Sequence, residues 1–208
     1  MENMLQTENR EETKLVLASL KNAISYGAYR TLVADHVQLG TSTGPEQSEA
    51  LSNYTVLSHA RMKRLDKTVK IPDSVAEQFR NVEGNYSWIV LTESWCGDAA
   101  QSMPAMNLLA NLAPNIHMKV VLRDDNLDLM GAFLTNGSRS IPKLLVFDED
   151  KQAVVQTWGP RPTVATKMVY AYKEEHGQLT PEFKKDLQVW YNKDKSQSII
   201  EDLTHLID

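Results

Sequence analysis

Apolar residues in the first part of the chain recur every three or four positions, the spacing that places side chains on one face of a helix. This pattern predicts one amphipathic helix over residues 10–35. The polar loop GTSTGPEQ follows, in which Thr43 and Glu46 resemble a capping box for a second helix that ends near Arg64. Because the pattern then changes, residues 1–70 are predicted to form an N-terminal helical extension.

Beyond this extension, short apolar runs alternate with helical stretches, which indicates an α/β layer structure over residues 71–208. The apolar runs predict strands at residues 88–92, 117–122, 143–147 and 153–157. Helical spacing predicts helices near residues 76–82, 99–112, 163–175, 181–191 and 198–206. The chain is therefore expected to hold one α/β domain with additional C-terminal helices.

The overall charge excludes two classes of partner. The 208-residue chain has a net charge of −5 and a pI near 5.6, so it lacks the bulk positive field that holds nucleic acid or an anionic membrane. We expect neither nucleic acid nor membrane as a partner. The acidic, polar start MENMLQTENREE and the absence of a long apolar stretch predict a cytoplasmic protein.

Cysteine and histidine usage narrows the possible chemistry. Cys96 is the sole cysteine, which excludes an internal disulfide and a metal site built from several thiolates. The five histidines show no metal-ligand spacing, and Asp124-Asp125 is interpreted as a turn or helix-cap signal rather than a cation site. We expect no metal and no cofactor, which leaves Cys96 as either a buried structural thiol or a reactive one.

The segment around this cysteine carries the most informative motif. A predicted strand leads into Trp95-Cys96-Gly97-Asp98 and then into a helix with Pro104, eight residues after the cysteine. This order resembles the active-site strand, turn and kinked helix of thioredoxins, whose motif is Trp-Cys-Gly-Pro-Cys. An interior proline otherwise destabilises a helix by ~3 kcal/mol, so its position supports the resemblance.

A second motif follows 46 residues further on, where Ser140-Ile141-Pro142 precedes a predicted strand. It resembles the thioredoxin segment that holds a cis-proline before a core strand. The resemblance implies that the cis-proline faces the active-site cysteine and that the Ile141 backbone pairs with substrate. Gly159 matches a glycine that the family places beside the same groove. The resemblance covers about residues 70–175 and implies a thioredoxin-like fold with a mixed sheet of four or five strands.

Two positions depart from the thioredoxin pattern. Ala99 stands where the family has its second, resolving cysteine, and Val90 stands where it has a buried aspartate. In a dithiol enzyme the second thiol attacks the mixed disulfide and the carboxylate helps to move its proton. The segment LTESWCGDAAQ is similar in sequence to a little-studied bacterial branch of thioredoxin-like proteins with this one-cysteine motif. We therefore predict that Cys96 has no internal redox partner.

Two opposing effects act on the pKa of Cys96. A cysteine at the start of a helix gains thiolate character from the unpaired N–H groups and the helix dipole. Asp98 acts against this, because a carboxylate two residues away disfavours a second negative charge. Asp98 itself is interpreted either as part of the chemistry or as an acidic residue that complements the dipole, and the sequence leaves the net direction open.

We predict that the protein is a monothiol that performs thiol–disulfide exchange through a mixed disulfide. Cys96 is the expected catalytic residue, and its partner is a small-molecule thiol or a thiol or disulfide of another protein. The expected supporting residues are Trp95, Gly97, Asp98 and Ala99, and the expected substrate-binding residues are Ser140, Ile141, Pro142 and Gly159.

Several alternatives stay open. Cys96 is a buried remnant of a dithiol ancestor, or the domain is a non-catalytic binding or chaperone-like module, or it is a thiol-bridged iron–sulfur carrier. Residues 158–162 are interpreted as a turn, the alternative being that Arg161 binds an anion. The basic helix end from Arg61 to Lys70 is interpreted as solvated and receives no function.

Overall fold

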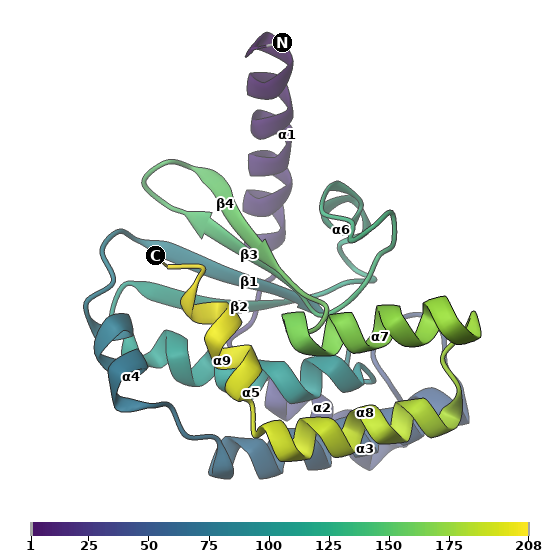
Figure 1. Ribbon diagram of the computed structural model, residues 1–208. Coiled ribbons are helices and arrows are strands. Elements are labelled where there is room, and N and C mark those ends of the chain that lie inside the picture. Colours follow the sequence, from purple (N-terminus) through teal and green to yellow (C-terminus); the bar gives the residue numbers. More distant parts are fainter. Residues whose placement is uncertain (1, 208) are drawn as a thin grey trace.

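The centre of the protein is a four-stranded mixed sheet, seen in a computed structural model that describes residues 2–207 (Figure 1). The strands are β1 (Tyr86–Thr92), β2 (Ile116–Leu122), β3 (Lys143–Asp148) and β4 (Ala153–Trp158). They lie in the order β2-β1-β3-β4, with β1 and β2 parallel and the other neighbours antiparallel. The predicted α/β class and the four predicted strands are confirmed.

Nine helices accompany the sheet within the described residues. They are α1 (Glu2–Leu20), α2 (Tyr26–Leu39), α3 (Glu49–Thr68), α4 (Asp73–Arg80), α5 (Gly97–Leu112), α6 (Leu127–Ala132), α7 (Thr163–His176), α8 (Pro181–Asp194) and α9 (Gln197–Thr204). In Figure 1, α5, α7 and α9 lie below the sheet, and α1 and α6 lie above it. The sequence pattern did not predict α6, which has only six residues and so shows no helical period.

Strand β1 forms part of the buried core. Trp88, Ile89, Val90 and Leu91 are all fully buried, so this strand is apolar on both faces. A continuous apolar run suits a strand that is covered by helices on both sides. The polar chain that follows β1 leaves the sheet at its carboxyl end and starts α5 there.

The single helix predicted over residues 10–35 is wrong. Between α1 and α2 the chain extends, and Ile24 forms a bridge with Val120 of the edge strand β2 through N–H···O bonds of 2.9 and 2.8 Å. Ser25 then caps α2. The bridge is a contact between distant parts of the sequence, which helical spacing cannot reveal.

The capping box expected at Thr43 and Glu46 is also wrong. Ser48 is the N-cap of α3, and its hydroxyl accepts an N–H from the first turn. Thr43 is buried instead, where its backbone N–H donates to Ser94 Oγ at 2.9 Å and its hydroxyl donates to the carboxylate of Glu93. The loop between α2 and α3 is therefore joined to the turn that follows β1.

The N-terminal helices make further contacts with this turn. The hydroxyl of Tyr29 on α2 donates to the carbonyl oxygen of Glu93 at 3.0 Å, and Thr55 on α3 lies 2.9 Å from Ser94, oxygen to oxygen. Helix α3 also packs along α5. The boundary placed at residue 70 stays a prediction.

Among the described helices, none is long and apolar enough to cross a membrane.

Candidate functional site

Cys96 lies at the N-terminus of α5, directly after the turn that follows β1. Its sulfur Sγ accepts the N–H of Ala99 at 3.4 Å, and the thiol donates to the carbonyl oxygen of Ile141 at 3.4 Å. Only 6% of the residue's surface is exposed. The fold therefore brings the cysteine motif and the proline motif into direct contact.

The loop before β3 has the predicted backbone geometry. The Ile141–Pro142 bond is cis, which confirms that prediction, and Gly159–Pro160 is cis as well. Gly159 has a φ of +118°, and a Cβ at this position would lie 2.1 Å from the carbonyl oxygen of Pro142. Glycine permits both the dihedral angle and the close approach, so the chain after β4 packs against the proline loop.

Asp98 forms a polar network beside the cysteine. Its carboxylate accepts hydrogen bonds from the guanidinium of Arg161 at 2.7 Å and from the hydroxyl of Tyr191 at 3.1 Å. Burial raises the pKa of Asp98, while the charge of Arg161 and both hydrogen bonds oppose this shift. Arg161, in the segment interpreted as a turn, thus belongs to the site. Asp98 links the start of α5 to that segment and to α8.

The surroundings of the thiol decide the net direction of its pKa. Burial, and after it the charge of Asp98, raise the pKa of Cys96 to about 12. Hydrogen bonds from the backbone of Ala99 and Asp98 and the charge of Arg161 act in the opposite direction. The stabilisation expected from the helix N-terminus is therefore outweighed, and little thiolate exists at neutral pH.

A cavity of about 500 Å³ opens beside the thiol, a size typical of small-molecule sites. The predicted site residues that line it are Trp95, Cys96, Gly97, Asp98, Ser140 and Ile141. The predicted residues Ala99, Pro142 and Gly159 are not in the lining. Ala99 and Pro142 are buried, and Gly159 supports the loop through its contact with Pro142.

Sequence reasoning missed most of the charged lining of this cavity. Its cationic side chains are Arg61 from α3, Arg123 after β2, Arg139 before β3, Arg161 after β4 and Lys184 from α8. Arg61 lies in the basic helix end interpreted as solvated, yet its Nη1 is 2.9 Å from where a Cβ of Gly97 would be. These cations meet only in the folded chain, so the sequence offered two signals, the basic run that begins at Arg61 and the alternative that Arg161 binds an anion.

Trp95 and Glu93 shape the turn that carries the cysteine. The guanidinium of Arg123 lies 5.0 Å from the ring centroid of Trp95, within cation–π range. Glu93 is fully buried, and its carboxylate accepts the backbone N–H of Asp124 at 2.9 Å and the hydroxyl of Thr43. Burial raises the pKa of Glu93. Glu93 therefore holds the turn in place and is absent from the cavity lining.

The adjacent acids considered as a cation site make other contacts. Asp124 pairs with Arg123 at 2.7 Å. In the part of the chain that the structure describes, no group of three or more His, Cys, Asp or Glu residues is arranged to hold a metal ion. The reactive and charged groups of the site are thus one thiol, the carboxylate of Asp98 with its hydrogen-bond partners, and several cationic side chains.

Comparisons with known proteins agree with this geometry. A family model described as thioredoxin matches residues 44–176, a segment that includes both motifs and all four strands. A solved protein of unknown function from Pseudomonas aeruginosa matches at 18% identity and a TM-score of 0.55, over 88% of this chain and 97% of its own. An HIV epitope-scaffold matches at 18% identity and a TM-score of 0.53, over 88% of this chain and 98% of its own. No curated protein matches the sequence. Because the family model spans more than half of its length, this chain belongs to the thioredoxin family and has a thioredoxin-like α/β fold with a single cysteine.

Proposed function

We propose that the protein performs monothiol thiol–disulfide exchange at Cys96. The thiol loses its proton to water, and the resulting sulfur anion attacks one sulfur of a substrate disulfide. A bond forms between Sγ and that sulfur, while the other sulfur leaves as a thiolate and takes up a proton. A second thiol, from a small molecule or another protein, then attacks the mixed disulfide and releases Cys96 as a thiol. The substrate disulfide is the oxidant, so no further acceptor is required.

One observation carries this proposal: the sole cysteine lies at the N-terminus of α5 in the wall of a cavity that would accept a small disulfide. The carbonyl oxygen of Ile141 lies 3.4 Å from the sulfur, and Ser140 lines the same cavity, so a bound disulfide would meet this backbone segment. Ala99 supplies no resolving thiol. The mixed disulfide therefore persists until an external thiol reacts with it.

The raised thiol pKa sets the expected rate. Only the thiolate is a nucleophile, so exchange is slow at neutral pH and accelerates as the pH rises towards the pKa of Cys96. In this proposal Asp98 restrains the thiol until a substrate or a pH change alters its surroundings.

The test is to incubate the full chain with glutathione disulfide over a range of pH and to measure the intact mass. We expect one adduct per chain, forming faster at higher pH. The variant Cys96→Ser keeps nearly the same side-chain volume and should form no adduct. A second sample treated with excess reduced glutathione should lose the adduct.

The low exposure of Cys96 favours a second candidate, a non-catalytic binding module whose cavity holds a ligand without reaction at sulfur. Wild-type protein that stays folded and unmodified even at high pH contradicts the exchange activity and supports this module. Circular dichroism of the same samples establishes whether the chain is folded.

A further inference from the structure

The cavity beside Cys96 is cationic, although the chain as a whole has a net charge of −5. Its lining holds five cationic side chains but only one carboxylate, that of Asp98. Asp98 already pairs with Arg161, and Arg123 pairs with Asp124. Three cations of the lining therefore have no carboxylate within ion-pair distance among the described residues; these are Arg61, Arg139 and Lys184.

Arg61 is the cation with the least favourable surroundings. Its guanidinium lies over Gly97, the residue next to the cysteine, and is partly buried. Burial lowers the pKa of Arg61, and the nearby charge of Asp98, which pairs with Arg161 instead, opposes this shift only in part. The Nε atom of Arg161, whose guanidinium pairs with Asp98, is buried and lacks a hydrogen-bond partner. Both groups would be stabilised by an anion bound in the cavity.

The size of the cavity favours a small ligand. A volume of about 500 Å³ is typical of a small-molecule site, whereas a stable protein interface buries a much broader and flatter surface. The five cations come from five separate segments of the fold, so they converge on one cavity instead of forming a stripe along one helix.

We infer that the substrates of Cys96 are small disulfides that carry carboxylate groups. This inference rests on the proposed exchange activity and names the class of disulfide that it acts on. A carboxylated disulfide that approaches a thiolate beside Asp98 meets two negative charges. Arg61, Arg139 and Lys184 offset this repulsion and raise the local concentration of the anion.

The test compares three disulfides of similar size and different charge: 3,3′-dithiodipropionate, bis(2-hydroxyethyl) disulfide and cystamine. Each rate of adduct formation on the full chain is measured by intact mass. The rate of each disulfide with the protein is then divided by the rate at which the same disulfide reacts with a free small thiol at the same pH. This normalisation removes differences in leaving-group reactivity between the probes. We expect the normalised rate of the anionic probe to exceed that of the neutral probe by about tenfold, with the cationic probe slowest. The difference should shrink at high salt.

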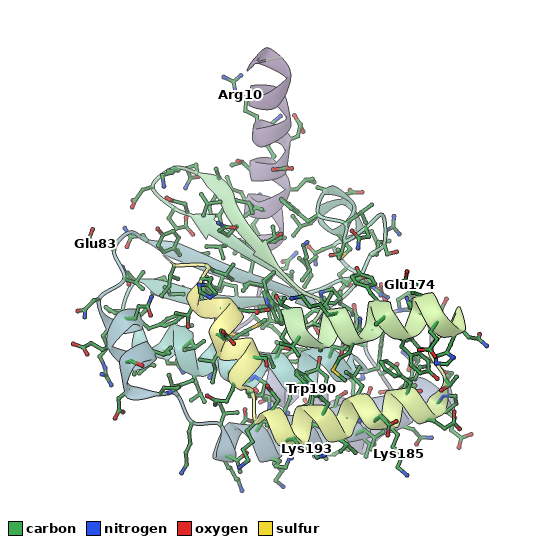
Figure 2. The ribbon with its side chains drawn as sticks, in the orientation of Figure 1. Arg10, Glu83, Glu174, Lys185, Trp190 and Lys193 are labelled. Carbon is green, nitrogen blue, oxygen red and sulfur yellow. The ribbon has the colours of Figure 1, made fainter. Side chains whose placement is uncertain are left out.

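Two variants connect this preference to the cavity. Arg61→Gln should lower the ratio of the anionic to the neutral rate about threefold or more. Lys185→Gln is the matched control, because Lys185 neighbours Lys184 on α8 but is not part of the lining. Figure 2 shows Lys185 on the side of α8 that faces away from α7. The control should leave the ratio unchanged.

The outcomes separate this inference from the proposed function. No adduct with any probe overturns both the exchange activity and the charge preference. Adducts that form at equal normalised rates overturn the preference and leave the exchange activity standing. A preference that persists in Arg61→Gln and is lost in Lys185→Gln places the recognition outside the cavity and also overturns the inference.

Discussion

At the scale of single residues, burial and a carboxylate two positions away act on the thiol in the same direction. Both raise the pKa of Cys96, and the backbone N–H groups at the start of α5 do not compensate. Asp98 is itself constrained, because Arg161 and Tyr191 hold its carboxylate in place. The reactivity of the cysteine should therefore respond to this one carboxylate more than to other single side chains.

The variant Asp98→Asn tests this dependence. It removes the negative charge and releases Arg161, so the pKa of Cys96 should fall. Each unit of decrease makes the thiolate tenfold more abundant but less nucleophilic, a net gain of roughly threefold in rate at neutral pH. The measurement is the pH profile of adduct formation, whose midpoint should move to lower pH.

A matched control for this variant is Tyr191→Phe. It removes the hydrogen bond from Tyr191 to Asp98 but leaves the carboxylate charged. Its pH profile should stay close to that of the wild type. An identical profile for Asp98→Asn and wild type would show that Asp98 does not control the thiol.

Gly159 offers a stability prediction at the same scale. The variant Gly159→Ala would place a Cβ 2.1 Å from the Pro142 carbonyl oxygen at a φ of +118°. Backbone atoms cannot easily move aside, so we expect a loss of more than ~2 kcal/mol in the free energy of unfolding. Urea unfolding followed by circular dichroism measures it.

Gly131→Ala is the contrasting variant for this measurement. Gly131 lies in α6 with nothing within 4 Å of the added Cβ. Alanine is favoured over glycine in a helix, so this variant should be neutral or more stable by up to ~1 kcal/mol. Equal effects of the two substitutions would refute the close-approach argument.

At the scale of elements, the local apolar pattern predicted most strands and helices, and contacts between distant parts of the sequence explain the elements that were predicted wrongly. The four strands and helix α5 with Pro104 inside it follow from short-range apolar spacing and one motif. The cis Ile141–Pro142 bond followed from the family resemblance. The break after α1 depends on the bridge between Ile24 and Val120, which lie far apart in the sequence.

Most of the cationic side chains of the cavity were also not predicted, because they come together through contacts between residues far apart in the sequence. Lys184 lies in a helix 88 residues after the cysteine, and nothing in its local sequence relates it to Cys96, whereas Arg139 directly precedes the proline motif and was overlooked. Helix α8 lies beyond residues 44–176, the segment that the family model matches. The supporting residues were placed by the motif, while the partners of Asp98 required the fold.

The resolving position on α5 carries the prediction at this scale. The variant Ala99→Cys places a second thiol where the backbone N–H already lies 3.4 Å from Sγ of Cys96. Under mild oxidation the chain should lose the mass of two hydrogens as an internal disulfide forms. It should also gain at least partial activity in reducing insulin with a recycling reductase, which the wild type should lack.

The control for this prediction is a variant that adds a cysteine at a different position of α5. Ala105→Cys adds a cysteine at another fully buried site further along α5, out of reach of Cys96. It should show neither the internal disulfide nor the activity. If folded Ala99→Cys forms no internal disulfide, then the thiol of Cys96 does not point towards the resolving position.

At the scale of the whole molecule, buried hydroxyl groups join helices that lie far apart in the sequence. Tyr26 on α2 donates to Asp66 on α3 at 2.7 Å, and Tyr191 on α8 donates to Asp98 at 3.1 Å. Tyr29 connects α2 to the turn after β1. Burial is the first cause that raises the pKa of each of these phenols. The assembled chain therefore depends on their staying protonated.

This dependence predicts a loss of stability at alkaline pH. For an acid whose pKa is higher in the folded state, stability is complete below the unfolded-state pKa and falls as the pH rises towards the folded-state pKa. The unfolded-state values are ~8.5 for the thiol and ~10 for the phenols, so the decline should start near pH 9. Each group contributes up to ~1.4 kcal/mol per pH unit.

Urea unfolding at a series of pH values from neutral to alkaline measures this decline, and Tyr29→Phe isolates one phenol. Without its hydrogen bond to the Glu93 carbonyl this variant should be less stable by ~1 kcal/mol at neutral pH. Because phenylalanine does not titrate, its stability should fall less steeply above pH ~10. Tyr170→Phe, at a side chain with 49% of its surface exposed, should keep the wild-type slope. If Tyr29→Phe and wild type instead lose stability in parallel above pH ~10, then the hydroxyl of Tyr29 ionises as easily in the folded chain as in the unfolded one. That result would contradict the argument that the folded chain depends on a protonated Tyr29 to join α2 to the turn after β1.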